Sequence, residues 1–259
     1  MVNFPEVEDV ILERAPLTEV IAQVRFPPVL RIAEETPASF QEAIRTRLPH
    51  FSQEQELSVQ LPTKVEKGKY PAVQVQQTNP VYRFQSPDTK TTATLAVDFY
   101  ALSTKAYQHW EDFWALIQLV NGAVQDVYSP NHAMRVGLRY INQITLRDTP
   151  LGSVDELRDL ANPALVELFQ QPPWNAPIEM LNRLLLQGDQ DEDRLMLRFG
   201  LKTQGESLLL LDFDYFQEGQ IPFEGLEAFY RRAHDIIYRA FRWSVKERAL
   251  SIFGPLEEV

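Results

Sequence analysis

The residues best suited to acid–base or metal chemistry are the four histidines, His50, His109, His132 and His234. They are far apart in the sequence and form none of the HxH or HExxH spacings that are typical of zinc sites. His234 precedes Asp235, but adjacent residues of a helix do not face each other. This pair is therefore better explained by a histidine at the edge of an apolar helix face, and the sequence predicts no catalytic residue.

A run of carboxylates at residues 188–193, Gly-Asp-Gln-Asp-Glu-Asp, could offer oxygen ligands to a divalent cation. It lacks the twelve-residue calcium-loop pattern, so a solvated acidic turn between two strands is the better interpretation. The chain has no cysteine, only 10 glycines and no phosphate-binding glycine motif. We expect no metal and no cofactor, and a metal-dependent hydrolase is the weakest functional hypothesis.

Amides and arginines recur on the side of the predicted strands that alternates away from apolar residues. They form the candidate ligand-binding set: Glu19, Gln23, Arg25, Arg83, Arg139, Gln143 and Arg198. If the two strands that open the two halves of the chain lie side by side, these residues share one surface, with Glu19 placed to pair with Arg25 and Arg139. The alternative is an ordinary solvated sheet face, which antiparallel sheets commonly have.

Composition narrows the class of protein. The chain has 259 residues, of which 44% are apolar and 24% charged, as in ordinary globular proteins. Lys and Arg number 25 and Asp and Glu 36, which gives a net charge of −11. Such a charge disfavours nucleic acid and anionic membrane as partners, although a local basic patch could overcome it. We see no signal-peptide pattern and no membrane-spanning run, and we expect a cytoplasmic protein.

Two long helices are expected, each after a group of strands. The first is predicted at about residues 104–128 and the second at 222–245, where apolar residues recur at helical spacing. Ser153 with Glu156 predicts the capped start of a shorter helix region, and another short helix is expected at residues 36–48. The predicted strands are residues 15–26, 57–61, 71–78, 81–85, 92–99, 134–146, 178–187, 194–202 and 207–215.

The order of these elements is the same in both halves of the chain: strand, helix, several strands, long helix. A local echo supports duplication, since Leu95-Ala-Val-Asp98-Phe99 resembles Leu209-Leu-Leu-Asp212-Phe213. We therefore predict an α+β fold of two pseudo-repeated halves, residues 1–130 and 131–259, in one continuous globular unit. It resembles a duplicated TATA-binding-protein-like fold, in which a curved antiparallel sheet carries long helices on one face; this analogy does not transfer function.

Four segments also resemble a sporadically distributed bacterial family of proteins of about this length: residues 16–26, Tyr107-x-x-Trp110-x-x-Phe113, residues 135–142, and residues 233–241. The resemblance spans nearly the whole chain, with the motifs in order. The chain departs from the family pattern after its last long helix, where it reads Ser244-Val-Lys-Glu. The family has no assigned activity, so the resemblance implies fold boundaries and no mechanism.

These observations predict a non-catalytic binding or interaction module that presents a polar sheet face to a protein or small ligand. The alternative is a nucleic-acid-associated protein, or a nucleic-acid-processing enzyme, that uses Arg25, Arg83, Arg139 and Arg198. The identity of the partner and the oligomeric state are left open by the sequence.

Overall fold

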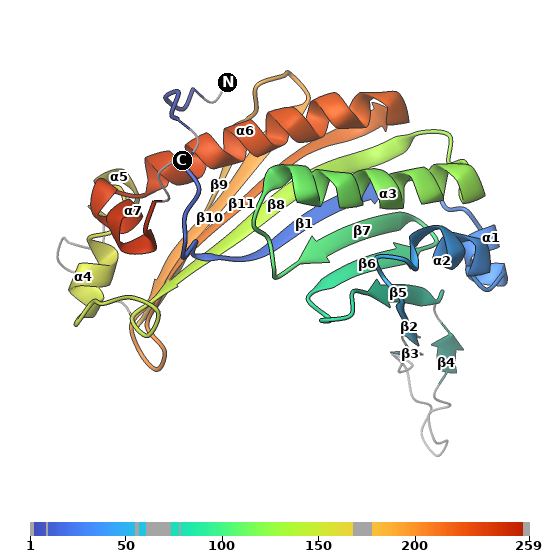
Figure 1. The fold of residues 1–259 in the computed structure, drawn as a ribbon, viewed down its shortest axis with the longest axis horizontal. Coiled ribbons are helices and arrows are strands. Elements are labelled where there is room, and N and C mark those ends of the chain that lie inside the picture. The colour runs from blue at the N-terminus through green and yellow to red at the C-terminus, as the bar shows by residue number, and fades with distance from the viewer. Residues whose placement is uncertain are drawn as a thin grey trace, which may run out of the picture.

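The fold is organised around one open antiparallel sheet, as the computed structural model shows (Figure 1). The structure describes residues 3–8, 10–54, 57–60, 74–77, 79–167 and 178–255, with side chains for all but 57–60 and 74–77. Nine strands lie in the order β2-β5-β6-β7-β1-β8-β11-β10-β9, and each is antiparallel to its neighbours. The α+β class and the antiparallel sheet are as the sequence predicts.

The first half of the chain supplies five strands of this sheet and a separate pair. The sheet strands are β1 (Leu17–Arg25), β2 (His50–Glu54), β5 (Val81–Gln85), β6 (Thr91–Ala96) and β7 (Phe99–Thr104). The separate pair consists of β3 (Leu57–Gln60) and β4 (Gln74–Gln77). The helices of this half are α1 (Arg31–Glu34), α2 (Ala38–Ile44) and the long α3 (Trp110–Tyr128).

The second half of the chain supplies the other four strands of the sheet. They are β8 (Ala133–Thr145), β9 (Glu179–Gln187), β10 (Asp193–Lys202) and β11 (Leu208–Ile221). Its helices are α4 (Val154–Arg158), α5 (Pro163–Val166), a 3-10 turn η2 (Phe223–Gly225), the long α6 (Leu226–Ser244) and α7 (Glu247–Phe253). The Ser153 hydroxyl accepts a hydrogen bond from the Glu156 amide at 3.2 Å, which confirms the predicted cap.

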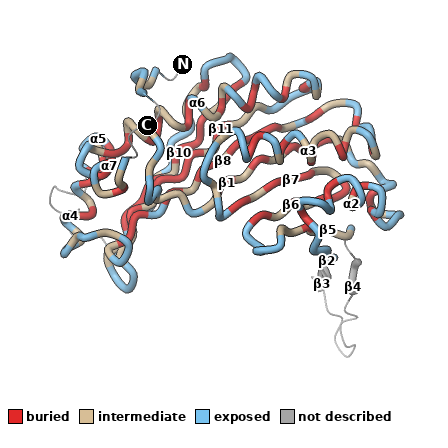
Figure 2. Tube along the Cα trace, in the orientation of Figure 1, coloured by how far each residue is buried: buried red, intermediate tan, exposed pale blue. Residues whose placement is uncertain are grey.

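Strands β1 and β8, which open the two halves of the chain, meet at the middle of the sheet. Their ladder pairs Ile21 with Arg139 and Val24 with Val136. In β1 the buried residues are Val20, Ala22 and Val24, and β8 follows the same alternation from Val136 to Ile144 except that Gly137 is buried as well. Figure 2 colours both strands by burial. The buried side chains belong to one apolar core, so period-two patterning fixes which face each strand turns to it.

The long helices contact the sheet through that core. α3 contacts β7, and Tyr100 of β7 donates a hydrogen bond to Asn121 of α3 at 2.9 Å. α6 contacts β8 and β11, and the Tyr140 hydroxyl of β8 lies 2.9 Å from His234 Nδ1 of α6. Phe229 and Ile237 in the middle of α6 are buried, as its apolar stripe predicts.

Three local features differ from the sequence expectation. The predicted strand at 92–99 is two strands, β6 and β7, joined by a turn at Val97 and Asp98. The residues expected to open the first long helix instead lie in β7 and a connection, and α3 begins at Trp110. β2 was not predicted; its five residues are all exposed and show no apolar alternation.

In the described ranges, no helix is long and apolar enough to span a membrane.

Candidate functional site

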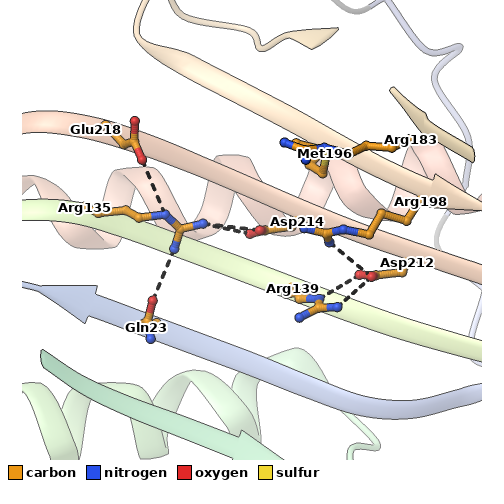
Figure 3. A network of polar contacts seen from close by, with 9 residues as sticks. All are labelled: Gln23, Arg135, Arg139, Arg183, Met196, Arg198, Asp212, Asp214 and Glu218. Carbon is orange, nitrogen blue, oxygen red and sulfur yellow. Dashed lines mark hydrogen bonds and ion pairs between the residues drawn. The ribbon is translucent and has the colours of Figure 1, made fainter. Parts of the chain in front are cut away.

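The candidate site is a cluster of charged side chains on the sheet face opposite Val136, Leu138 and Tyr140. We call it the polar network; Figure 3 shows its members, which are Gln23, Arg135, Arg139, Arg183, Met196, Arg198, Asp212, Asp214 and Glu218. They come from five adjacent strands, β1, β8, β11, β10 and β9. The ladder pairs Arg139 with Asp214 and Asp212 with Arg198, so cross-strand neighbours of opposite charge share this face.

Asp212 is the centre of the network. Arg139 donates to both of its carboxylate oxygens, from Nε and Nη2, at 2.7 Å each. Arg198 Nη1 donates to the same carboxylate at 3.1 Å. The Asp212 side chain is only 3% exposed, whereas those of Arg139 and Arg198 are 36% and 28% exposed. The hydrogen bonds to Asp212 raise the pKa of Arg139, and the nearby charges of Asp212, Asp214 and Glu19 add to this effect.

Arg135 and Asp214 form a second pair beside the first. Arg135 Nη2 lies 3.2 Å from each Asp214 oxygen, and Nη1 donates to Gln23 Oε1 at 3.3 Å. The guanidinium also lies 4.7 Å from the ring centre of Phe216. Burial raises the pKa of Asp214, and this effect exceeds the opposing effects of the neighbouring arginines. The network therefore contains a carboxylate that is held in a poorly hydrated place.

Not all donors of the network are used within it. Asp212 is engaged by two guanidinium groups, and within the described residues Arg139 Nη1 and Arg198 Nη2 have no carboxylate partner. Each guanidinium carries five N–H donors in a fixed planar fork that matches a carboxylate or phosphate. The pair can therefore bind an anionic group from the solvent side without losing Asp212.

The structure brings together only part of the predicted set. Gln23, Arg139 and Arg198 are members of the network. Arg25 instead pairs with Asp98 at 2.7 Å, and Arg83 Nη2 donates to Glu54 at 3.0 Å, both at exposed positions.

Glu19 and Gln143 share the network's face by alternation but form no hydrogen bond with it. Glu19 lies opposite Ile141 on β8, so it is not the partner of Arg25 or Arg139; those partners are Asp98 and Asp212.

Sequence reasoning missed six members of the network: Arg135, Arg183, Met196, Asp212, Asp214 and Glu218. Two patterns in the sequence could have indicated three of them. Arg135 is four residues before Arg139 in the same strand and so lies on the same face, and Asp212 and Asp214 alternate with the apolar residues of β11. Asp212 also belongs to the local echo with Asp98, which sequence reasoning used only as a sign of duplication.

Two of the other candidates from the sequence, Asp193 and His234, have structural partners. Asp193, at the end of the acidic turn, is fully buried; it accepts hydrogen bonds from Tyr215 at 2.7 Å and from Arg232 at 2.8 Å. The ring of His234 stacks on Trp110, with centres 4.4 Å apart. In the described part of the chain, no group of three or more His, Asp or Glu residues could hold a metal ion.

A scan of the chain against protein-family models finds no match, and a search of curated proteins finds none either.

Proposed function

We propose that this protein is a non-catalytic interaction module that binds a carboxylate-bearing group, on a protein or a small ligand, over Arg139 and Arg198. The single observation that carries the proposal is that these two guanidinium groups share one buried carboxylate, Asp212, and keep donors directed away from it. We place the protein in the bacterial cytoplasm, in keeping with the family resemblance.

Pre-organisation supports this proposal. The guanidinium group of Arg139 is held at two points by Asp212, so little side-chain freedom remains to be lost when a ligand binds. The binding group would add a charge-assisted hydrogen bond to each arginine, and such bonds are stronger than those between neutral groups. Ile21 and Ile141 lie on the same face and are partly buried, and they would give an apolar border to the polar contact.

The nucleic-acid alternative receives less support from the same contacts. All four arginines on which it depends form ion pairs: Arg25 with Asp98, Arg83 with Glu54, and Arg139 and Arg198 with Asp212. A phosphate backbone is bound by a stripe of unneutralised positive charge. The alternation of arginines and carboxylates on this face is better suited to a ligand with a few localised charges.

The test compares two labelled probes, a glutamate-rich peptide and a single-stranded oligonucleotide, by fluorescence anisotropy at increasing salt. We expect the peptide to bind, and Arg198→Gln to weaken it roughly tenfold through the loss of one charge-assisted contact. The matched control is Arg45→Gln at the C-cap of α2, which breaks an exposed pair with Glu42 away from the network and should leave binding unchanged. Equal peptide binding by the three proteins, or retention of the oligonucleotide alone, would contradict the proposal.

We also propose that the chain is a duplicated unit resembling the TATA-binding-protein-like fold, with a curved sheet and both long helices on one face. The strand order supports it: β5-β6-β7-β1 in the first half mirrors β9-β10-β11-β8 in the second, about the β1–β8 ladder. Tyr100 and Tyr140 both lie on the face of Val24 and Val136, and they hydrogen-bond to α3 and α6.

Two ion pairs add to the support for duplication. Arg25 with Asp98 and Arg139 with Asp212 are related by the same offset in sequence, and both pairs form. The correspondence is not complete, since Asp98 lies in the β6–β7 turn whereas Asp212 lies within β11. We attribute the difference to a shift of register between the halves.

A further inference from the structure

The strand β9 is an edge of the sheet with an apolar surface open to solvent. Its ladder partner is β10, and it stands at the end of the strand order (Figure 1). Leu181 and Leu185 are 63% and 55% exposed. A long edge strand with exposed apolar residues is a template for pairing with another strand, and proteins usually shorten, cover or charge such edges.

Two charged residues of β9, Arg183 and Glu179, form no ion pair within the described part of the chain, and this indicates the charges that a neighbouring strand would carry. Arg183 is directly opposite Arg198 in the β9–β10 ladder, a like-charged pair. Arg198 turns to Asp212, whereas Arg183 turns aside and its Nε lies 3.0 Å from Met196 Sδ (Figure 3). Within the described residues, no carboxylate forms an ion pair with Arg183. Glu179, four residues earlier on the same face, lies opposite Lys202 in the ladder but forms no ion pair with it in that part of the chain.

We propose that a second copy of this chain pairs with β9, antiparallel, about a two-fold axis through Leu181. In this register Glu179 lies opposite Arg183 of the partner subunit, and by symmetry the second such pair forms on the other side of the axis. Leu181 lies opposite Leu181 of the partner subunit, and Met180 lies opposite Asn182 of the partner subunit. The partner thus supplies a carboxylate for Arg183 and an apolar neighbour for Leu181.

Neighbouring registers are less favourable for the same residues. An axis through Arg183 would place two arginines directly opposite each other, beside the arginine already present at position 198. An axis through Asn182 would place Arg183 opposite Leu181 of the partner subunit and leave Glu179 opposite a leucine. Only the axis through Leu181 matches charge with charge and leucine with leucine, so sequence and strand parity select the register.

The pairing would extend the sheet across two molecules. Backbone hydrogen bonds along the β9 edges would supply affinity, as in other cases of strand addition, while the side-chain pairs would set the register. Because both faces of the sheet are preserved by this axis, the two polar networks would lie on the same side of the extended sheet. The proposal is independent of what the networks bind.

Charge reversal tests the proposal sharply because the two pairs are related by symmetry. We expect wild-type protein to sediment as a dimer in analytical ultracentrifugation over a concentration series. Glu179→Arg alone, or Arg183→Glu alone, converts both pairs into like-charged pairs and should raise the dissociation constant on the order of a hundredfold, about tenfold for each pair. The double variant exchanges the charges and should restore the homodimer.

Mixing the two single variants gives the discriminating result. One supplies two arginines and the other two glutamates, so they should form a heterodimer although neither forms a homodimer. Arg45→Glu at the C-cap of α2 is the control and should leave the dimer intact. Circular dichroism checks that every variant is folded. Three results would each overturn the proposal: wild-type protein that is monomeric at all concentrations, a dimer whose dissociation constant is unchanged by either charge reversal, or folded single variants that do not associate when mixed.

Discussion

At the scale of single residues, Asp212 is the position on which the polar network depends. It is almost fully buried and is the shared counterion of Arg139 and Arg198. Asp212→Asn leaves two partly buried guanidinium groups without their counter-charge, and we expect a loss on the order of 3 kcal/mol in the free energy of unfolding. Urea unfolding measures it, with Glu42→Gln of an exposed helical pair as a control that should show no change. A loss no larger than that of the control would mean that solvent replaces Asp212.

We expect Asp214 to make the protein less stable as the pH rises. Burial raises its pKa in the folded protein above the ordinary value of 3.8, although Arg135 and other arginines oppose the shift. As the pH rises the unfolded chain therefore ionises first, so the contribution of Asp214 to stability is full below pH 3.8 and is lost as the pH passes through the raised pKa. Relative to Asp214→Asn, wild-type protein should lose stability across this window, measured by urea unfolding at a series of pH values.

Asp159 provides the opposite case for comparison. Its hydrogen bond to Lys246 lowers its pKa from 3.8, so its contribution to stability is present above pH 3.8 and is lost as the pH falls through the lowered pKa. Asp159→Asn should therefore change the profile with the opposite sign to Asp214→Asn. Profiles of the same sign for the two variants would show that Asp214 is well solvated.

The sequence predicts which face of the sheet each site residue lies on, but it does not predict the residue with which each forms an ion pair. Strand periodicity places Arg25 and Arg139 away from the core, and the structure confirms this. The expectation that Glu19 pairs with both arginines was wrong. Which residues meet across a sheet depends on the register of the strands, and the register is fixed by turns and by the packing of distant strands. Asp98 illustrates the difficulty, since it meets Arg25 from a turn that no glycine or proline marks.

At the scale of elements, α6 gives the most direct test of the packing. Phe229 is 2% exposed and contacts the rings of Tyr215 and Tyr230, so Phe229→Ala should lower the free energy of unfolding by about 3–5 kcal/mol. Arg231→Ala, two residues further on, removes exposed ion pairs with Glu227 and Glu111 and a contact of the guanidinium with the Trp114 ring, and should lower it far less. Similar thermal shifts for the two variants would mean that the helix is rotated about its axis.

The accuracy of the element prediction followed the strength of the local pattern. α6 and β8 have long periodic patterns, and their predicted bounds are close to those observed. β2 was missed because its exposed residues carry no apolar alternation, and its place depends on pairing with β5. The β6–β7 hairpin was missed because Val97-Asp98 is not one of the turn dipeptides that sequence reasoning can recognise.

At the scale of the whole molecule, the β1–β8 ladder joins the two halves through backbone hydrogen bonds and a shared core. If the chain is divided between residues 130 and 131 and the fragments are co-expressed, we expect them to associate, because each half exposes an unpaired strand when alone. Co-purification through a tag on the first fragment measures this, and residues 1–130 alone should be poorly soluble. Two fragments that are each soluble, monomeric and folded would show two independent domains.

The strand order β5-β6-β7-β1 also has a consequence for the order in which the chain is synthesised. β1 is among the first segments to leave the ribosome, yet one of its two ladder partners, β8, ends only at Thr145. Until β8 emerges, the side of β1 that receives it has unpaired backbone groups. During translation the first half is therefore a natural client for chaperones that bind exposed strands, and slow translation just before β8 would lengthen this exposure.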